Sequence, residues 1–314
     1  MDIDTSDFAV TRIGGEQIPL TRDFVENIAI ISKIEGKCMA DPSLHFEVTQ
    51  SKFLRDRKFY LKNVLAPLIA SGKVSDGTSG PYDDRKLRFD SAGSTRFDLN
   101  AHLSESHGSR DVLRLAFGIT YFGEHKKAMD RSPEENNSLR RKGLEDFGDQ
   151  YAYFPRAPGA SGLVISSEGS VFLGTRNYRG REMLQTVAGH LPYKENVEDI
   201  SLEEGVFEET REEFGIPKED IARTVFVGAY EEPHSGDIDF THLLFTKLDN
   251  SQVREAWRTQ REDEEHKRLI EIPSYAQVKS LLDDGSVRGE TIKYGLFQPT
   301  RGALMSLRQE EISD

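Results

Sequence analysis

The segment Gly189–Ile216, GHLPYKENVEDISLEEGVFEETREEFGI, leaves this chain fewer ways to fold than any other part of the sequence. Ser201 occupies a helix N-cap position with Glu204 three residues later, which is the spacing of a capping box. Gly215 occupies the position of a helix C-terminal glycine. Together these signals predict a helix over residues 202–214.

The faces of this predicted helix differ in chemistry. A packing stripe recurs every four residues, at Leu202, Val206, Thr210 and Phe214. At about 100° per residue, three carboxylates fall within one arc beside the stripe, those of Glu209, Glu212 and Glu213. Such crowded like charges repel one another unless a cation lies among them, and Mg²⁺ takes oxygen ligands of this kind. The pattern favours a metal site, with a solvated acidic helix face as the plain alternative.

The residues around this helix resemble the signature of the Nudix hydrolase family. That signature begins with a glycine, which is followed by five residues and then a glutamate. After seven more residues comes the run Arg-Glu-hydrophobic-x-Glu-Glu-x-Gly-hydrophobic. Gly189 and Glu195 match the first part. Glu209 and the run from Glu212 to Ile216 match the last part.

Two positions depart from the family pattern. Twelve residues, not seven, separate Glu195 from position 208, but Ser201 keeps the family's spacing to 208. The additional residues 196–200 are therefore expected to enlarge the loop and to leave the helix in register. Glu208 stands where the family has arginine, and Arg211 is spaced to pair with it.

Two later stretches resemble the branch of this family that acts on ADP-ribose and nucleotide sugars. GAYEEPHSGDIDFTHLLFTKL resembles that branch's tyrosine, Ser/Gly turn, acidic residue and strand. REDEEHKRLIEIPSYAQVKSLLDDG resembles its acidic loop, strand ending in proline and helix. In such enzymes a glutamate of the acidic loop can act as base toward the attacking water. The resemblance makes Glu264 and Glu265 candidates, and a solvated charge run is the plain alternative.

The resemblance implies hydrolysis of a diphosphate linkage in a nucleoside-diphosphate derivative, either ADP-ribose-like or a nucleotide sugar, with Mg²⁺ or Mn²⁺ as cofactor. The implied metal ligands are Glu209, Glu212 and Glu213, and the catalytic candidates are Glu209, Glu264 and Glu265. The implied substrate contacts are Gly189, Glu195 and Asp237, with Asp199 as the alternative to Glu195. Arg176 is a further predicted substrate contact, because arginine suits bidentate binding of phosphate; a structural salt bridge is the equal alternative. His190 is a further candidate for a phosphate contact.

The fold class expected is α/β (α+β), with two domains. Residues 156–314 are expected to form a Nudix-type α/β/α sandwich, and residues 1–155 a separate mixed α/β domain of no recognised role. The boundary is placed in the loop YFPRAPGA, between residues 149 and 160. A length of 314 residues fits two cores.

Local patterns predict several further elements. In the second half we expect a hairpin turning at Ser166–Ser170, strands at 184–187, TVFVGAY and DFTHLLFTKL, and a helix at SYAQVKSLLDDG. In the first half we expect a short strand and helix over 45–72, a loop over 75–80, and a strand at DVLRLAFGITYF. A helix starting at Pro133, capped by Ser132 and closed by Gly148, completes the set.

Composition narrows the class of partner. The formal net charge is −13, and residues 151–314 carry 19 Lys and Arg against 30 Asp and Glu. Such acidity argues against a nucleic-acid footprint and suits a site that holds cations. The absence of a long apolar run argues against membrane insertion, and an acidic start argues against a signal peptide. We expect a soluble, cytoplasmic protein with a small-molecule nucleotide substrate; a homodimer is left open.

Three alternatives stay open from the sequence. A non-catalytic Nudix module would bind a nucleotide as a sensor, which fits Glu208 and the widened loop but not the three retained glutamates. An isomerase acting on a prenyl diphosphate would need a cysteine at the site, and Cys38 lies far from the motif. The N-terminal half could also carry the main activity.

Overall fold

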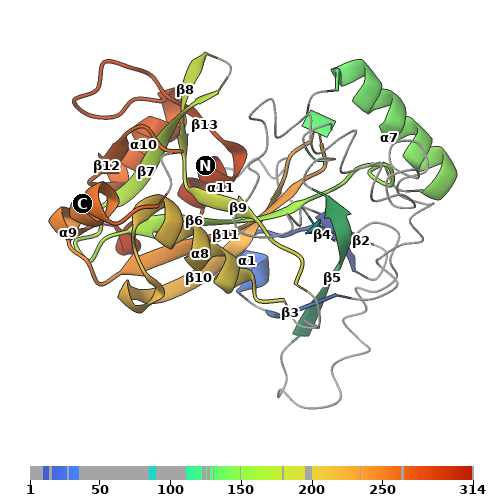
Figure 1. Cartoon of the computed structure of the whole chain (residues 1–314), viewed down its shortest axis with the longest axis horizontal. Helices are drawn as coiled ribbons and strands as arrows, with labels where there is room; N and C mark the ends of the chain where they lie inside the picture. The colour runs from blue at the N-terminus through green and yellow to red at the C-terminus, as the bar shows by residue number, and fades with distance from the viewer. Residues whose placement is uncertain are drawn as a thin grey trace.

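Figure 1 shows the computed structural model of the chain. The residues that the structure describes are 10–13, 16–26, 28–34, 85–89, 111–121, 125, 128–129, 131–148, 150–178, 180–194, 200–233, 235–262 and 265–312. The strand and helix expected over 45–72 and the loop expected over 75–80 lie outside these residues.

An eight-stranded mixed sheet forms the centre of the second half. Its strands are β6 (Pro158–Ile165), β7 (Val171–Tyr178), β8 (Arg181–Gln185), β9 (Val187–His190), β10 (Ile221–Glu231), β11 (Ile238–Thr246), β12 (Leu269–Ile272) and β13 (Gly295–Leu296). The main path runs β10-β11-β6-β7-β8-β13, with β9 paired to β6 and β12 paired to β7. β6 is the branching strand, because its first half pairs with β9 and its last two residues pair with β7.

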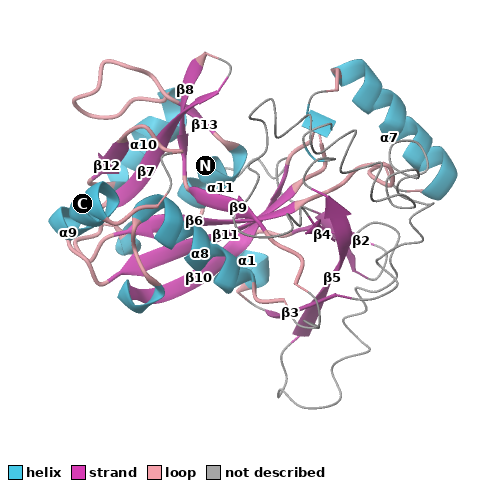
Figure 2. Cartoon of the chain, viewed as in Figure 1, coloured by secondary structure: helices cyan, strands magenta, loops and turns pink. Residues whose placement is uncertain are grey.

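Helices cover both faces of this sheet (Figure 2). They are α8 (Leu202–Phe214), α9 (Asn250–Thr259), α10 (Tyr275–Asp284) and α11 (Gln298–Met305). Alternate residues of β6 point to opposite faces: Ala160 and Val164 pack with α8 and α9, whereas Leu163 and Ile165 pack with α10 and α11. The expected α/β fold class is confirmed.

The helix that carries the glutamates forms between the expected residues. Ser201 Oγ accepts a hydrogen bond from the Glu204 amide at 3.3 Å, and Gly215 closes the helix with a φ of 71°. The reciprocal half of the expected capping box does not form, because the Glu204 carboxylate pairs with Lys218. The hairpin at Ser166–Ser170 is also confirmed, with the Ser166 amide 2.9 Å from the Ser170 carbonyl oxygen.

In the described part of the first half there are two small sheets and two helices. β1 (Val10–Ile13) pairs with β2 (Glu16–Pro19), and the order β3-β5-β4 joins Ile28–Ile34, Asp111–Tyr121 and Arg85–Phe89. α1 spans Arg22–Val25 and α7 spans Pro133–Phe147. The expected strand at β5 is confirmed, as is the expected helix at α7, with a full capping box at Ser132 and a left-handed Gly148.

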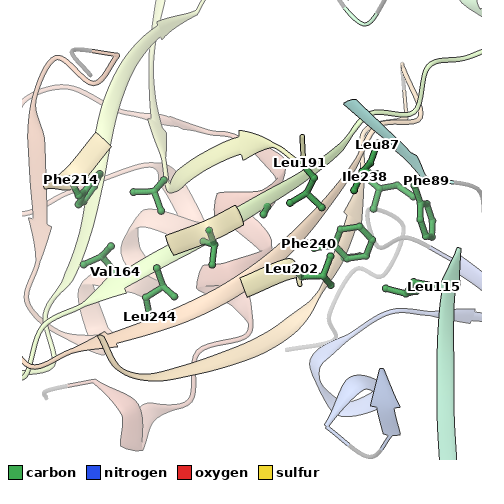
Figure 3. Close-up of a cluster of buried hydrophobic side chains, with 14 of the residues drawn as sticks. Leu87, Phe89, Leu115, Val164, Leu191, Leu202, Phe214, Ile238, Phe240 and Leu244 are labelled. Atoms are coloured by element: carbon green, nitrogen blue, oxygen red, sulfur yellow. The ribbon is translucent and has the colours of Figure 1, made fainter. Parts of the chain in front are cut away.

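The two halves share one hydrophobic cluster, part of which Figure 3 shows. The Phe240 ring of β11 lies 5.6 Å from the Phe89 ring of β4 and 5.8 Å from the Phe117 ring of β5. The cluster also takes in Leu87 and Leu202. The strands of the first half therefore help to bury the apolar surface of the second.

The loop at the expected domain boundary is buried in this arrangement. Arg88 Nε donates to the Phe154 carbonyl at 3.2 Å, and its Nη2 donates to the Tyr151 carbonyl at 3.1 Å. Arg156 has a φ of 41° and lies 2.9 Å from Glu231 of β10. Two buried arginines thus fix this loop between the halves. The division at residues 155 and 156 stays a prediction.

Candidate active site

Glu209 of α8 and Gly189 of β9 are in direct contact. A Cβ atom on residue 189 would overlap the Glu209 carboxylate, so glycine is the residue that leaves room for this side chain. The buried stripe of α8, which includes Val206 and Phe214, fixes the helix against the sheet and so sets this approach. The structure brings these two predicted site residues together.

Glu209 lies in an unfavourable place for a negative charge. Burial, followed by the charges of Glu213 and Glu212, raises its pKa from 4.5 to about 8. The Lys86 charge acts in the opposite direction. A divalent cation among these carboxylates would relieve the same repulsion.

Glu213 points inward from α8 and is 2% exposed. Its Oε2 accepts a hydrogen bond from the Ala188 amide of β9 at 3.1 Å and lies 3.2 Å from His266 Nε2. His266 is buried edge-on against Phe214, with ring centroids 5.7 Å apart. Glu213 therefore ties the helix to β9 and to the end of the acidic loop. His266 was not among the residues predicted for the site, because a single histidine after an acidic run gives no distinctive signal.

Glu212 occupies the rim, with 38% of its side chain exposed. Arg211 Nη2 lies 3.1 Å from Glu212 Oε1, and Nη1 of the same arginine pairs with Glu262. Arg211 therefore pairs with Glu212 and Glu262 and not with Glu208, the partner that the spacing also allowed. The reason is tertiary: the segment after α9 brings Glu262 close to the helix, and its amide donates to the Glu212 carbonyl at 2.7 Å.

The donor chemistry of the three helix glutamates fits a hard divalent cation, since all their oxygens are carboxylate oxygens. Their crowding, visible in the raised pKa of Glu209, also fits a cation. Glu209 and Glu213 point to adjacent residues of β9, Gly189 and the Ala188 amide, whereas Glu212 pairs with Arg211 at the rim. Within the described ranges, no group of three or more His, Cys, Asp and Glu side chains is already arranged to hold a metal ion. Binding one would require a change of rotamer at the rim.

Arg176 of β7 and Glu265 of the acidic loop form an ion pair. The structure thus joins a predicted substrate contact to a predicted base, in a salt bridge of the kind that the sequence left open for Arg176. The two side chains are 42% and 28% exposed, so the pair is open to solvent. Glu195 and Glu264, also predicted for the site, lie outside the described residues.

Asp237, predicted as a substrate contact, precedes β11 and is held by three groups. Its Oδ2 lies 2.9 Å from His125 Nδ1 and accepts from Ser235 Oγ at 2.7 Å. Its Oδ1 accepts from the Ala157 amide at 2.9 Å. Burial acts to raise its pKa, but the His125 charge and hydrogen bond, the His190 charge and Ser235 outweigh burial and hold the pKa at about 2.

The site includes two residues of the first half that the sequence did not reveal. The His125 ring lies 4.4 Å from the His190 ring of β9, edge to face. Lys86 of β4 forms an isolated antiparallel bridge with Pro192, just beyond β9. Neither position belongs to a recognisable motif, so no sequence signal could have placed them beside the second half.

Helices long and apolar enough for membrane insertion do not occur in the described part of the chain.

Comparisons with known proteins give only distant likenesses. No protein-family model matches the chain, and no curated protein matches it. A solved structure described as a hydrolase of the NUDIX family from Clostridium perfringens is 16% identical, with 48% of this chain and 95% of that chain covered and a TM-score of 0.30. A NUDIX hydrolase from Nitrosomonas europaea is 16% identical, with coverages of 37% and 70% and a TM-score of 0.26. At such scores the function must be argued from the side chains of this chain.

Proposed function

We propose that this chain is a Nudix-type pyrophosphohydrolase that cleaves the diphosphate linkage of a nucleoside-diphosphate derivative, an ADP-ribose-like compound or a nucleotide sugar. One observation carries the proposal: α8 sets Glu209 on Gly189 and Glu213 on the amide of Ala188. The motif glycine and two motif glutamates, separate in sequence, therefore meet at the end of β9. A merely solvated acidic face would leave these carboxylates in water.

Each side chain has a distinct role in this proposal. Glu209 and Glu212 supply carboxylates to a bound Mg²⁺ or Mn²⁺, and Glu213 holds the helix at the correct distance from β9 through Ala188 and His266. When bound, such a cation neutralises charge on the phosphate oxygens and favours deprotonation of the attacking water. The proposed metal ligands are thus one exposed glutamate, Glu212, and one more deeply placed glutamate, Glu209, on the same helix.

The pair of Arg176 and Glu265 suggests how substrate could prepare the base. Guanidinium groups bind phosphate oxygens in a bidentate manner. A phosphate that engages Arg176 competes with Glu265 for the same donors. Once Arg176 binds phosphate, Glu265 accepts a proton from the attacking water, which is the role that the resemblance to the ADP-ribose branch implies.

The test uses the full chain with ADP-ribose and a panel of nucleotide sugars, in Mg²⁺, in Mn²⁺ and in excess chelator, with nucleoside monophosphate release as the readout. Hydrolysis is expected with metal and not with chelator. Glu212→Gln should lower turnover by about a hundredfold, as loss of a group that stabilises transition-state charge does. Glu203→Gln, at an exposed position in the first turn of the same helix, is the matched control and should keep wild-type turnover. Turnover that persists in chelator, or that survives Glu212→Gln, contradicts the proposal.

A second candidate is a module that binds the same nucleotides without hydrolysing them. It is favoured by Glu208 in place of the family arginine. Within the described residues, moreover, no three His, Cys, Asp or Glu side chains are already arranged to hold a metal ion. Calorimetry separates the two candidates: a protein that binds ADP-ribose in Mg²⁺ and releases no product over hours would be such a module.

A further inference from the structure

The acidic loop between α9 and β12 is attached to the glutamate helix at two places. Near its start, the Glu262 amide donates to the Glu212 carbonyl oxygen at 2.7 Å. At its end, His266 Nε2 lies 3.2 Å from Glu213 Oε2. The two attachment points are consecutive residues of α8, so both ends of residues 262–266 are tied to one turn of the helix. Glu265, a candidate base, directly precedes the second attachment.

His266 occupies a buried position that is shaped for a ring. A Cβ atom on Gly174 of β7 would overlap the imidazole, so glycine is the residue that leaves room for it. The Phe214 ring of α8 lies edge-on to the imidazole, with ring centroids 5.7 Å apart. Packing between β7 and α8 therefore holds the ring where Nε2 reaches Glu213.

The ring nitrogens of His266 indicate that its hydrogen bond matters more than its packing. Among the described residues, Nδ1 is buried without a hydrogen-bond partner. An unpaired buried polar atom lowers stability, and a phenylalanine ring would fill the same space without this cost. The reason for a histidine is therefore Nε2. An ionised carboxylate only accepts, so Nε2 donates to Glu213, which also accepts from the Ala188 amide.

The residues on either side of His266 are held by β7. The Lys267 amide donates to the Thr175 carbonyl oxygen at 2.9 Å. Glu265 forms its ion pair with Arg176, the next residue of β7. His266 thus lies between an attachment to β7 and the candidate base, and it is itself attached to α8. A shift of His266 would move Glu265 relative to the glutamates of the helix.

We propose that His266 is a positioning residue: through its hydrogen bond to Glu213, it fixes Glu265 at a set distance from the glutamate helix. The inference rests on the proposed function for the role of Glu265 as base. His266 acts through Glu213 on one side and through the adjoining backbone of Glu265 on the other. It takes no direct part in the chemical step.

Hydrolysis by variants of the full chain separates the hydrogen bond from the packing. His266→Phe keeps a ring on Gly174 and removes the donor. Its kcat for ADP-ribose in Mg²⁺ should fall at least about tenfold with KM nearly unchanged, because a misplaced base slows the chemical step. His266→Gln keeps a donor near the position of Nε2 and should restore most of kcat. Lys267→Gln, at the exposed next residue, is the matched control and should keep wild-type values.

Two kinetic outcomes contradict the inference. One is a wild-type kcat in His266→Phe, and the other is an equal loss of kcat in His266→Phe and His266→Gln. Gly174→Ala displaces the ring while keeping the histidine, so it should lower kcat as His266→Phe does and serves as the test where the phenylalanine variant does not fold.

Amide hydrogen exchange in chelator tests the attachment without any turnover. In His266→Phe the Glu262 and Lys267 amides should exchange about tenfold faster than in the wild type, while the hairpin at Ser166–Ser170 keeps its rates. His266→Gln should restore slow exchange. Unchanged exchange at both loop amides in His266→Phe overturns the inference even if hydrolysis is intact. Faster exchange that glutamine restores, with no hydrolysis by the wild type, supports the attachment and contradicts the enzyme.

Discussion

The carboxylate of Glu209 rests against the α-carbon of Gly189, with no room between them for a side chain on residue 189. Gly189→Ala should therefore push Glu209 out of place. Forced overpacking of this kind costs about 1–3 kcal/mol of unfolding free energy. Turnover should fall at least tenfold, because the displaced carboxylate no longer meets β9.

The double variant Gly189→Ala, Glu209→Ala separates the clash from the chemistry. Removing the long side chain should restore most of the stability lost in Gly189→Ala, since the two residues are in contact and their effects do not add. Activity should stay low. Urea denaturation with a turnover assay checks both outcomes, and additive losses of stability would contradict the contact.

Glu209 should make the metal-free protein less stable as pH rises. Its pKa is raised from 4.5 to about 8, so between these values the folded state keeps a proton that the unfolded state loses. Stability therefore falls from about pH 4.5 to about pH 8 and levels off above. Glu209→Gln removes this dependence. The difference in unfolding free energy between the variant and the wild type should therefore shift by about 1–3 kcal/mol in favour of the variant between pH 5 and pH 9. Denaturation in chelator measures it; parallel pH profiles for the two proteins would contradict the buried carboxylate.

Glu213 and Glu212 should respond differently to the same substitution. Glu213 is buried on the Ala188 amide and His266, so Glu213→Gln should cost about 1–2 kcal/mol through a disturbed buried contact. Glu212 is at the rim, and Glu212→Gln should change stability by less than about 0.5 kcal/mol. Thermal midpoints in chelator compare them. Equal shifts of the thermal midpoint in the two variants would contradict the difference in burial between Glu213 and Glu212.

Asp237 should stabilise the fold above acid pH. Its pKa is lowered from 3.8 to about 2, so its contribution is present in full above about pH 5 and is lost as pH falls toward 2. Asp237→Asn should be less stable than wild type by about 2 kcal/mol at pH 7, and the difference should shrink on acidification. Asp284→Asn, an exposed aspartate on α10, is the comparison and should change little. A difference that stays constant down to pH 2 would count against the pairing with His125.

The sequence by itself determined the local elements. The caps of α7 and α8, the hairpin at Ser166–Ser170 and the strand β5 follow from signals within a few residues of one another, because a helix end or a tight turn satisfies its backbone locally. The three glutamates of α8 were predicted to share an arc because helical periodicity also relates residues only a few positions apart. The helical periodicity does not predict which of the three carboxylates is buried.

Tertiary structure decided the rest, because it depends on pairs distant in the chain. Glu209 contacts Gly189 only when α8 packs on β9. Arg211 pairs with Glu262 only when the segment after α9 lies against α8. The loop at the expected domain boundary is held in place by two buried arginines. Arg88 donates a hydrogen bond to the Tyr151 carbonyl, and Arg156 forms an ion pair with Glu231. Burial and long-range charge pairing arise once the chain has closed on itself, so no local pattern of residues carries them.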